Sequence, residues 1–228
     1  MINEIYRKVR YNLFAAMPAS RKSDQKVKDC IRKVRYNLFG KLPVLGRRPS
    51  QGETSKAQGR REREGFFEKY CRGKGIDIGY AGDPVVPSVQ GWDFEHGDAQ
   101  YMRGLEDESF DFVYSSHLLE HLPDIEIALN HWNRVLKPGG YLLLYLPHRD
   151  LYEKKTTLPS RFNDDHMHFF LPQEDEAPDT VGLEPLVKRL FPEHELIYCR
   201  TCDEGYVNHG DELPSEGEFS IELVLKKA

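Results

Sequence analysis

The sequence predicts a doubly wound α/β fold, in which helices cover both faces of a mostly parallel sheet. Two observations support this prediction. Apolar strand patterns alternate with helical patterns from about residue 74 onward. Turns rich in glycine and acidic residues follow several of these strands, as expected at the carboxyl edge of a parallel sheet. The 228 residues, 39% of them hydrophobic, suffice for one such domain and an extension.

Six strands and two helices are expected in this body. The expected strands are residues 74–79, 88–93, 110–115, 141–146, 194–200 and 219–225. The expected helices are residues 124–136 and 181–190. The run Tyr141-Leu142-Leu143-Leu144-Tyr145-Leu146 is continuously apolar, which is typical of a central parallel strand. The preceding helix has apolar residues at helical spacing, and Lys137-Pro138-Gly139-Gly140 is expected to end it.

The first 63 residues differ in composition from the rest. They hold 17 Lys+Arg and 5 Asp+Glu, a net charge of +12, whereas the remainder has a net charge of −17. The segment from Arg7 to Phe14 recurs letter for letter from Arg32 to Phe39, and each copy predicts a short amphipathic helix with a basic face. Residues 42–59 predict a linker, since Pro, Gly, Ser and Gln are frequent there. We therefore expect a basic helical arm at residues 1–63 and the folded domain at residues 64–228.

The arm has four interpretations. It can lie on an anionic membrane surface, dock on a partner protein, bind nucleic acid, or pack as a solvated tail on the acidic body. We expect a membrane surface or a protein as partner of residues 1–40, because the acidic body disfavours nucleic acid. No apolar run approaches the roughly 20 residues of a membrane-spanning helix, and no signal-peptide pattern is present. The expected location is the cytoplasm, with peripheral binding to the inner face of the membrane as an option.

Three acidic turns follow the first strands of the body. Asp77-Ile78-Gly79-Tyr80-Ala81-Gly82-Asp83 combines acids with small residues, so its backbone can approach a ligand closely. Asp93 ends the second strand and can accept hydrogen bonds from both hydroxyls of a ribose, with Glu95 as the alternative. Gly97-Asp98-Ala99 offers an acid that can accept from an adenine amino group. Each of these turns taken alone is also compatible with an ordinary surface turn.

Three further motifs follow in order. They are Ser109-Phe110-Asp111, Leu119-Glu120-His121 and Leu136-Lys137-Pro138-Gly139-Gly140. With this order and spacing, residues 74–148 resemble the class I S-adenosylmethionine-dependent methyltransferases. The resemblance implies S-adenosyl-L-methionine as cofactor and a Rossmann-like sheet of seven strands whose last strand is antiparallel. The cofactor-binding residues that it implies are Asp77, Gly79, Tyr80, Gly82, Asp93, Asp98, Ala99, Ser115, Ser116 and His117.

The sequence departs from the family pattern in its N-terminal half. Ala81 and Asp83 stand where the family usually has glycine, and Pro84 and Pro87 shorten the first helix. Only four residues separate Asp93 from Asp98, too few for a helix and a strand. We therefore expect a shortened N-terminal half of the sheet, without the second helix and most of the third strand.

The expected activity is methyl transfer to a small polar acceptor, such as a sugar hydroxyl of a surface-glycan or natural-product pathway. A hydroxyl acceptor needs a base, and the candidates are His117, His121, His148 and His166, of which His117 and His148 are preferred. The pair Cys199 and Cys202 is too small a ligand set for zinc, so no metal is expected. The alternatives are a non-catalytic scaffold that recruits a partner or membrane through the arm, and a nicotinamide enzyme. The nicotinamide enzyme is disfavoured because the chain lacks a full Gly-x-Gly-x-x-Gly motif.

Overall fold

A computed structural model describes residues 52–228, so the repeat and the other predictions for residues 1–51 lie outside the described part of the chain. The body contains a six-stranded sheet in the order β2-β1-β3-β4-β8-β7 and a two-stranded sheet of β5 and β6. The strands are β1 Gly75–Ile78, β2 Gln90–Trp92, β3 Phe110–Ser116, β4 Leu136–Pro147, β5 Phe169–Leu171, β6 Thr180–Gly182, β7 Glu195–Cys202 and β8 Ser220–Lys226. The helices are α4 Glu53–Lys56, α5 Gln58–Glu64, α6 Phe66–Tyr70, α7 Ile125–Val135 and α8 Leu183–Leu190.

The strand directions confirm the predicted fold class. β2, β1, β3 and β4 pair in parallel, whereas β8 runs antiparallel to both of its neighbours, β4 and β7. The sheet has six strands rather than the seven that the family resemblance implies. Within residues 52–228, the segment from Asp93 to Asp98 contains turns and no strand, in agreement with the predicted shortening.

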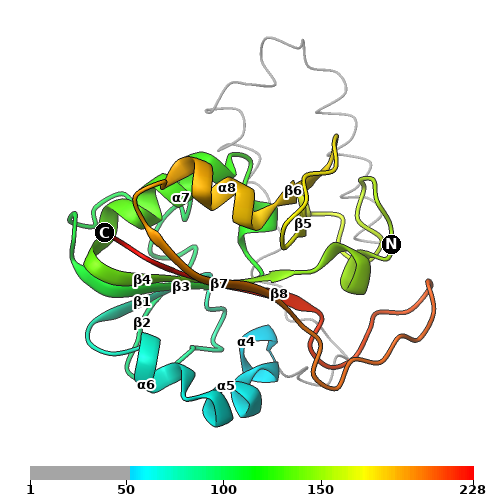
Figure 1. Cartoon of the computed structure of the whole chain (residues 1–228), viewed down its shortest axis with the longest axis horizontal. Coiled ribbons are helices and arrows are strands. Elements are labelled where there is room, and N and C mark those ends of the chain that lie inside the picture. The colour runs from blue at the N-terminus through cyan, green and yellow to red at the C-terminus, as the bar shows by residue number, and fades with distance from the viewer. Residues whose placement is uncertain (1–51) are drawn as a thin grey trace. The chain divides into compact units, whose positions relative to one another are not determined.

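Helices cover both faces of the sheet, with α7 and α8 on one face and α4, α5 and α6 on the other (Figure 1). The strands supply two apolar faces because successive side chains alternate in direction. In β4, Leu142 and Leu144 join the core under α7 and α8, whereas Leu143 and Tyr145 join the core on the other face. This alternation explains why a continuous apolar run forms the central strand.

Helix α7 follows the predicted pattern closely. Asp124 caps its start, since the Asp124 carboxylate accepts a hydrogen bond from the backbone N–H of Ile127 at 3.0 Å. Ala128, Leu129 and Trp132 are fully buried and lie at helical spacing. The predicted helix at residues 181–190 is shorter in the structure, because Val181 and Gly182 belong to β6.

Helices α4 and α5 begin before residue 64, and they belong to the compact unit that contains the sheet. These residues fall where composition predicts a linker and a basic arm. Arg60 donates to the carboxylate of Glu218 at 2.8 Å, and Arg61 donates to the carboxylate of Glu222 at 2.7 Å. Arg61 is 1% exposed. These arginines therefore anchor α5 to the sheet instead of contributing to a solvated basic arm.

Candidate functional site

The carboxyl ends of β1, β2, β3 and β4 lie along one edge of the sheet because these strands are parallel. The turn after β1 shows the conformation that a close ligand approach requires. Gly79 has a φ of +77°, and a Cβ at this position would lie 2.8 Å from a methyl carbon of Leu118. Gly82 has a φ of +81°, and a Cβ built there meets no atom within 4 Å. The backbone around Gly82 is therefore open on the side where a Cβ would stand.

Asp93 lies at the tip of β2 beside this turn. Its carboxylate accepts hydrogen bonds from the backbone N–H groups of Ala81 at 3.2 Å and Phe94 at 2.8 Å. A carboxylate offers about four lone-pair sites, so these two bonds orient it and leave capacity for two hydroxyl donors. The Glu95 side chain, by contrast, is 56% exposed. This geometry favours Asp93 over Glu95 as the residue that faces a ribose.

Asp98 and Ala99 form a turn that is tied to the body. The Asp98 carboxylate accepts from the backbone N–H of Gln100 at 2.8 Å. The Ala99 carbonyl accepts from the indole N–H of Trp132 at 2.8 Å. Because Trp132 is fully buried in α7, this hydrogen bond anchors the turn to α7.

Two of the predicted cofactor contacts have buried side chains. Asp77 is fully buried, and its carboxylate accepts from the backbone N–H of Val85 at 2.8 Å, while its second oxygen has no hydrogen-bond partner among residues 52–228. Burial raises the pKa of Asp77 to about 7. The Ser115 hydroxyl donates to the carbonyl of Ile78 at 3.0 Å, which ties β3 to β1. These side chains therefore support the edge from within the sheet.

Tyr80 and Ser116 differ in how their polar groups are placed. The ring of Tyr80 covers Gly91, where an added Cβ would lie 2.5 Å from a ring carbon. The hydroxyl oxygen of Ser116 is buried and has no hydrogen-bond partner in the described chain. A buried hydroxyl without a partner is costly, and a ligand at this edge can supply the partner.

Helix α4 reaches the site from the N-terminal side. The Asp83 carboxylate accepts from the backbone N–H of Ser55 at 3.0 Å and from the Ser55 hydroxyl. Asp83 thus holds α4 beside the turn, which gives a structural reason for an acid where the family usually has glycine. The Glu53 carboxylate of α4 lies 3.9 Å from Nε2 of His117. Sequence reasoning missed Glu53 because the surrounding composition predicts a linker.

His117 follows β3 and has a φ of +46°. Its backbone N–H donates to the carbonyl of Tyr145 at 2.8 Å, and its Nε2 lies 2.8 Å from the hydroxyl of Ser220. The imidazole packs against the rings of Tyr145, Tyr152 and Phe219. Burial, together with the nearby Lys56 ammonium, holds the pKa of His117 well below its usual value, so the ring is neutral near pH 7.

His148 has a capping role in the structure. It precedes the π-helical turn Arg149–Glu153, and its Nδ1 accepts from the backbone N–H of Asp150 at 3.2 Å. His148 is 8% exposed, and burial lowers its pKa. The cap occupies one ring nitrogen of His148, as the Ser220 hydroxyl occupies one ring nitrogen of His117, so each of the two preferred bases keeps one nitrogen for another partner.

Acidic and histidine side chains gather after β3. Oε1 of Glu120 lies 3.7 Å from Nε2 of His121, 3.8 Å from Nε2 of His166 and 4.0 Å from Nδ1 of His117. Glu120 is fully buried, and neither of its oxygens accepts a hydrogen bond from another described residue. Burial raises the pKa of Glu120 to about 7. We name Glu120, His121 and His166 the Glu120 cluster. The motif that contains Glu120 was visible in the sequence, but its neighbour His166 is distant in the chain.

The two cysteines on β7 point to opposite faces of the sheet. Cys199 packs against the core under α7 and α8, whereas Cys202 belongs to the core on the other face. Residues three apart on a strand have opposite directions. Cys199 and Cys202 therefore cannot converge on one ion.

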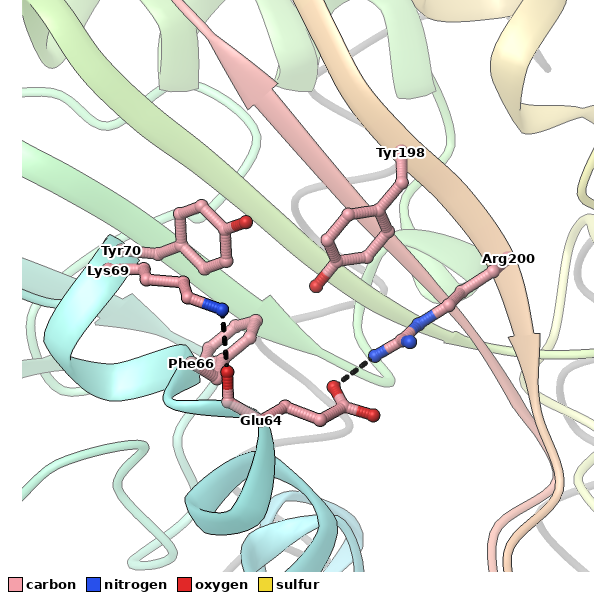
Figure 2. A pocket seen from close by; sticks show the side chains of 6 residues that line it. All are labelled: Glu64, Phe66, Lys69, Tyr70, Tyr198 and Arg200. Carbon is pink, nitrogen blue, oxygen red and sulfur yellow. Dashed lines mark hydrogen bonds and ion pairs between the residues drawn. The ribbon is translucent and has the colours of Figure 1, made fainter.

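A pocket of about 320 Å³ lies over α5, α6 and β7 (Figure 2). Its charged groups pair with one another: Lys69 donates to the carbonyl of Glu64 at 2.7 Å, and Arg200 donates to the Glu64 carboxylate. The full lining is Glu64, Phe66, Lys69, Tyr70, Tyr198 and Arg200. None of these is a predicted site residue, so the candidate site remains at the strand ends. Among residues 52–228, no helix is long and apolar enough to span a membrane.

Comparisons with known proteins agree with this architecture. The family model of a methyltransferase domain matches residues 64–144. A demethylmenaquinone methyltransferase of Staphylococcus aureus is 40% identical over 62 residues, which are 27% of this chain and 25% of that protein. The chain thus spans about a quarter of the length of the curated relatives that it matches.

Two solved structures share the fold. One is a sarcosine dimethylglycine methyltransferase candidate from Galdieria sulphuraria, with a TM-score of 0.50 and 13% identity over 88% of this chain and 98% of that chain. The other concerns the conversion of a disulfide bond into a thioacetal group during echinomycin biosynthesis, with a TM-score of 0.54 and 13% identity over 86% and 92% of the two chains. The strand order, the antiparallel β8 and the matched domain lead to one conclusion. Residues 64–144 thus match a methyltransferase domain, and the chain resembles the class I S-adenosylmethionine-dependent methyltransferases in fold.

Proposed function

We propose that the protein transfers the methyl group of S-adenosyl-L-methionine to a small polar acceptor. The observation that carries this proposal is the pairing of the open turn at Gly82 with the carboxylate of Asp93. Two backbone N–H groups orient this carboxylate, and it keeps lone pairs for the two hydroxyls of a ribose. The cofactor supplies a methyl group that its sulfonium already activates, so the protein has to bind and orient both partners.

The proposed contacts follow the edge of the sheet. Asp93 holds the ribose, while Asp98 and Ala99 face the adenine. The turn from Gly79 to Gly82, which includes Tyr80, lines the methionine part and is supported from within the sheet by Asp77 and Ser115. Ser116 and His117 close the sulfonium side, where the Ser116 hydroxyl has an unmet hydrogen-bond capacity. His117 is placed to accept a proton from the acceptor, and His148 is placed to hold the segment that follows β4.

The acceptor proposed here is a hydroxyl group, such as that of a sugar in a surface-glycan or natural-product pathway. Titratable groups gather at the end of β3: the Glu53 carboxylate lies 3.9 Å from Nε2 of His117, and the Glu120 carboxylate lies 4.0 Å from Nδ1 of His117. Buried polar groups are stable only when paired, so they favour a partner that can form hydrogen bonds. The matched Staphylococcus aureus relative is named for demethylmenaquinone, a different acceptor, and that match covers 27% of this chain.

Methyl transfer can be tested with the full chain and methyl-labelled S-adenosylmethionine. The acceptor panel contains sugar glycosides, hydroxylated natural products and demethylmenaquinone. Label is expected in hydroxylated acceptors, and His117→Ala is expected to lower kcat by about 100-fold or more, as loss of a general base does. The exposed-loop variant His209→Ala is the control and is expected to keep full activity.

Two results would contradict the proposal in different ways. Transfer to demethylmenaquinone alone would exclude the polar acceptor while retaining the methyl transfer. Tight cofactor binding without transfer to any acceptor would favour the non-catalytic scaffold.

We also propose that residues 1–40 bind an anionic membrane surface. The support is the +12 charge of the first 63 residues and the two identical basic segments with amphipathic spacing. This binding would place a protein peripherally on a membrane whose surface carries acidic lipids. A protein partner with an acidic face is the other outcome of the test described below.

A further inference from the structure

The Glu120 cluster has the composition and the spacing of a metal site. We propose that Glu120, His121 and His166 bind one divalent first-row transition-metal ion. Their three ligand atoms lie within 4.8 Å of one another. Two ligands of one ion at about 2.1 Å can be at most about 4.2 Å apart, so the Glu120–His121 and Glu120–His166 separations of 3.7 and 3.8 Å already fit. A small movement of the two imidazoles toward each other would bring all three ligand atoms within the distance that one ion allows.

The other ring nitrogen of each histidine is already fixed. Nδ1 of His166 lies 2.5 Å from the Glu153 carboxylate, and Nδ1 of His121 lies 3.2 Å from the carbonyl of Asp165. Metal-bound histidines almost always donate their second N–H to a carboxylate or a carbonyl in this way. With Nδ1 as the donor, Nε2 of both rings carries the lone pair, and both Nε2 atoms face Glu120.

Glu153 itself is held in place. Its carboxylate accepts from the Ser160 hydroxyl at 2.5 Å and from the backbone N–H of Arg161 at 3.3 Å, and Glu153 is 1% exposed. A supported carboxylate behind a ligating imidazole is the arrangement that raises ligand basicity and fixes ring orientation. The segment after β4 thus presents His166 to β3 with a defined direction.

Glu120 supplies the independent observation. It is fully buried, and among the described residues no other residue donates a hydrogen bond to either oxygen. A buried carboxylate is costly unless it is paired or coordinates a cation. Two imidazoles and one carboxylate suit zinc, iron, cobalt or nickel better than magnesium or calcium, which prefer oxygen ligands. Three protein ligands leave a coordination position open. Nδ1 of His117 lies 4.0 Å from the Glu120 carboxylate.

The competing explanation is an ion pair without a metal, in which a protonated His166 bridges Glu153 and Glu120. The two explanations differ for Glu120→Gln. In the metal-free protein this substitution replaces an unpartnered buried carboxylate by an amide of the same shape, so the metal site predicts unchanged or increased stability. The ion pair predicts a loss of stability, because a buried charge partner is removed.

The test uses the full chain, freed of metal by a chelator and titrated with Co²⁺ by visible absorption and with Zn²⁺ by calorimetry. One ion per chain is expected, with ligand-field absorption for Co²⁺. Glu120→Gln and His166→Gln are expected to abolish this binding, and Glu153→Gln to weaken it about 10–100-fold. His168→Gln is the matched control, because His168 lies in the same segment but its Nε2 faces the Leu122 carbonyl at 3.0 Å.

Absence of Co²⁺ and Zn²⁺ binding in the wild-type protein would overturn the proposal, as would equal binding in Glu120→Gln. Calorimetry of the same samples with S-adenosylhomocysteine keeps this test separate from the proposed methyl transfer. Cofactor binding without metal binding would overturn the metal site alone.

Discussion

Replacement of Glu222 by glutamine tests how the N-terminal helices are attached to the sheet. Glu222 lies on β8 and is 1% exposed. Its carboxylate accepts from Arg61 at 2.7 Å, from Arg60 at 2.9 and 3.1 Å, from the Tyr198 hydroxyl at 3.0 Å and from Arg200 at 3.1 Å. Glu222→Gln keeps the shape of the side chain but removes the charge that these three guanidinium groups share.

The expected loss of unfolding free energy follows from the pKa of Glu222. The arginines, above all Arg61, outweigh burial and lower this pKa from its ordinary value of 4.5 to about 2. One pKa unit corresponds to about 1.4 kcal/mol, so the ionised carboxylate contributes about 3 kcal/mol at neutral pH. Removal of one partner from a buried ion pair has a similar cost, about 3–5 kcal/mol. Because the folded pKa is the lower one, this contribution is complete above pH 4.5 and is lost as the pH falls toward 2.

Urea denaturation of the wild type and Glu222→Gln measures this effect. At about pH 7 the variant is expected to lose about 3 kcal/mol of unfolding free energy, and the difference is expected to shrink by about pH 3.5. Glu126→Gln is the control, since the pair of Glu126 with Arg189 at 2.8 Å is exposed and is expected to contribute under about 1 kcal/mol. A loss in Glu222→Gln no larger than that of the control, or a difference independent of pH, would refute the reasoning.

Three further predictions concern the turn and the arm. Asp83→Ala removes the acceptor for Ser55 at the start of α4 and is expected to cost about 1 kcal/mol in thermal unfolding; an unchanged Tm would contradict the capping role. Gly79→Ala strains a φ of +77° and meets Leu118 at 2.8 Å, so a loss of about 1–3 kcal/mol is expected, and wild-type stability would show that the turn can rearrange. Replacement of the six Lys and Arg residues in the two repeats by Gln is expected to abolish co-sedimentation with vesicles of acidic lipid. Equal binding of wild type and variant, or binding of the wild type to neutral vesicles only, would exclude the anionic surface.

The sheet was predictable because its determinants are local in sequence. The apolar run after Gly140 predicted the buried part of β4, which in the structure begins already at Leu136, and the periodicity after Asp124 predicted α7. The short spacing between Asp93 and Asp98 likewise predicted the reduced N-terminal half. Each of these signals spans fewer than about 15 residues, within the range that pattern analysis covers.

The N-terminal helices could not be predicted in this way. Arg60 and Arg61 have the pattern of a solvated basic segment, and their burial depends on Glu218 and Glu222, which are about 160 residues away in the chain. Charged residues are rarely buried without partners, and a single sequence does not show the partners.

In the candidate site, too, features set by local sequence were predictable and contacts between distant segments were not. The rule that ligands bind at the carboxyl ends of parallel strands directed attention to the edge that carries Gly79, Asp93 and His117. Glu53 and Glu120 were missed as site residues, because their neighbours come from other segments: His117 for Glu53 and His166 for Glu120. His148 was assigned as a base from its position after β4, and the structure shows that its ring also caps the following turn.

Calorimetric titration with S-adenosylhomocysteine tests the central claim most directly. The wild type is expected to bind in the micromolar range, about −8 kcal/mol. Asp93→Ala removes two charge-assisted hydrogen bonds to the ribose and is expected to lose about 3 kcal/mol, roughly 100-fold in Kd, whereas Glu95→Ala is expected to bind like the wild type. Absence of binding to the wild type, or equal affinity in Asp93→Ala, would contradict the proposed cofactor site.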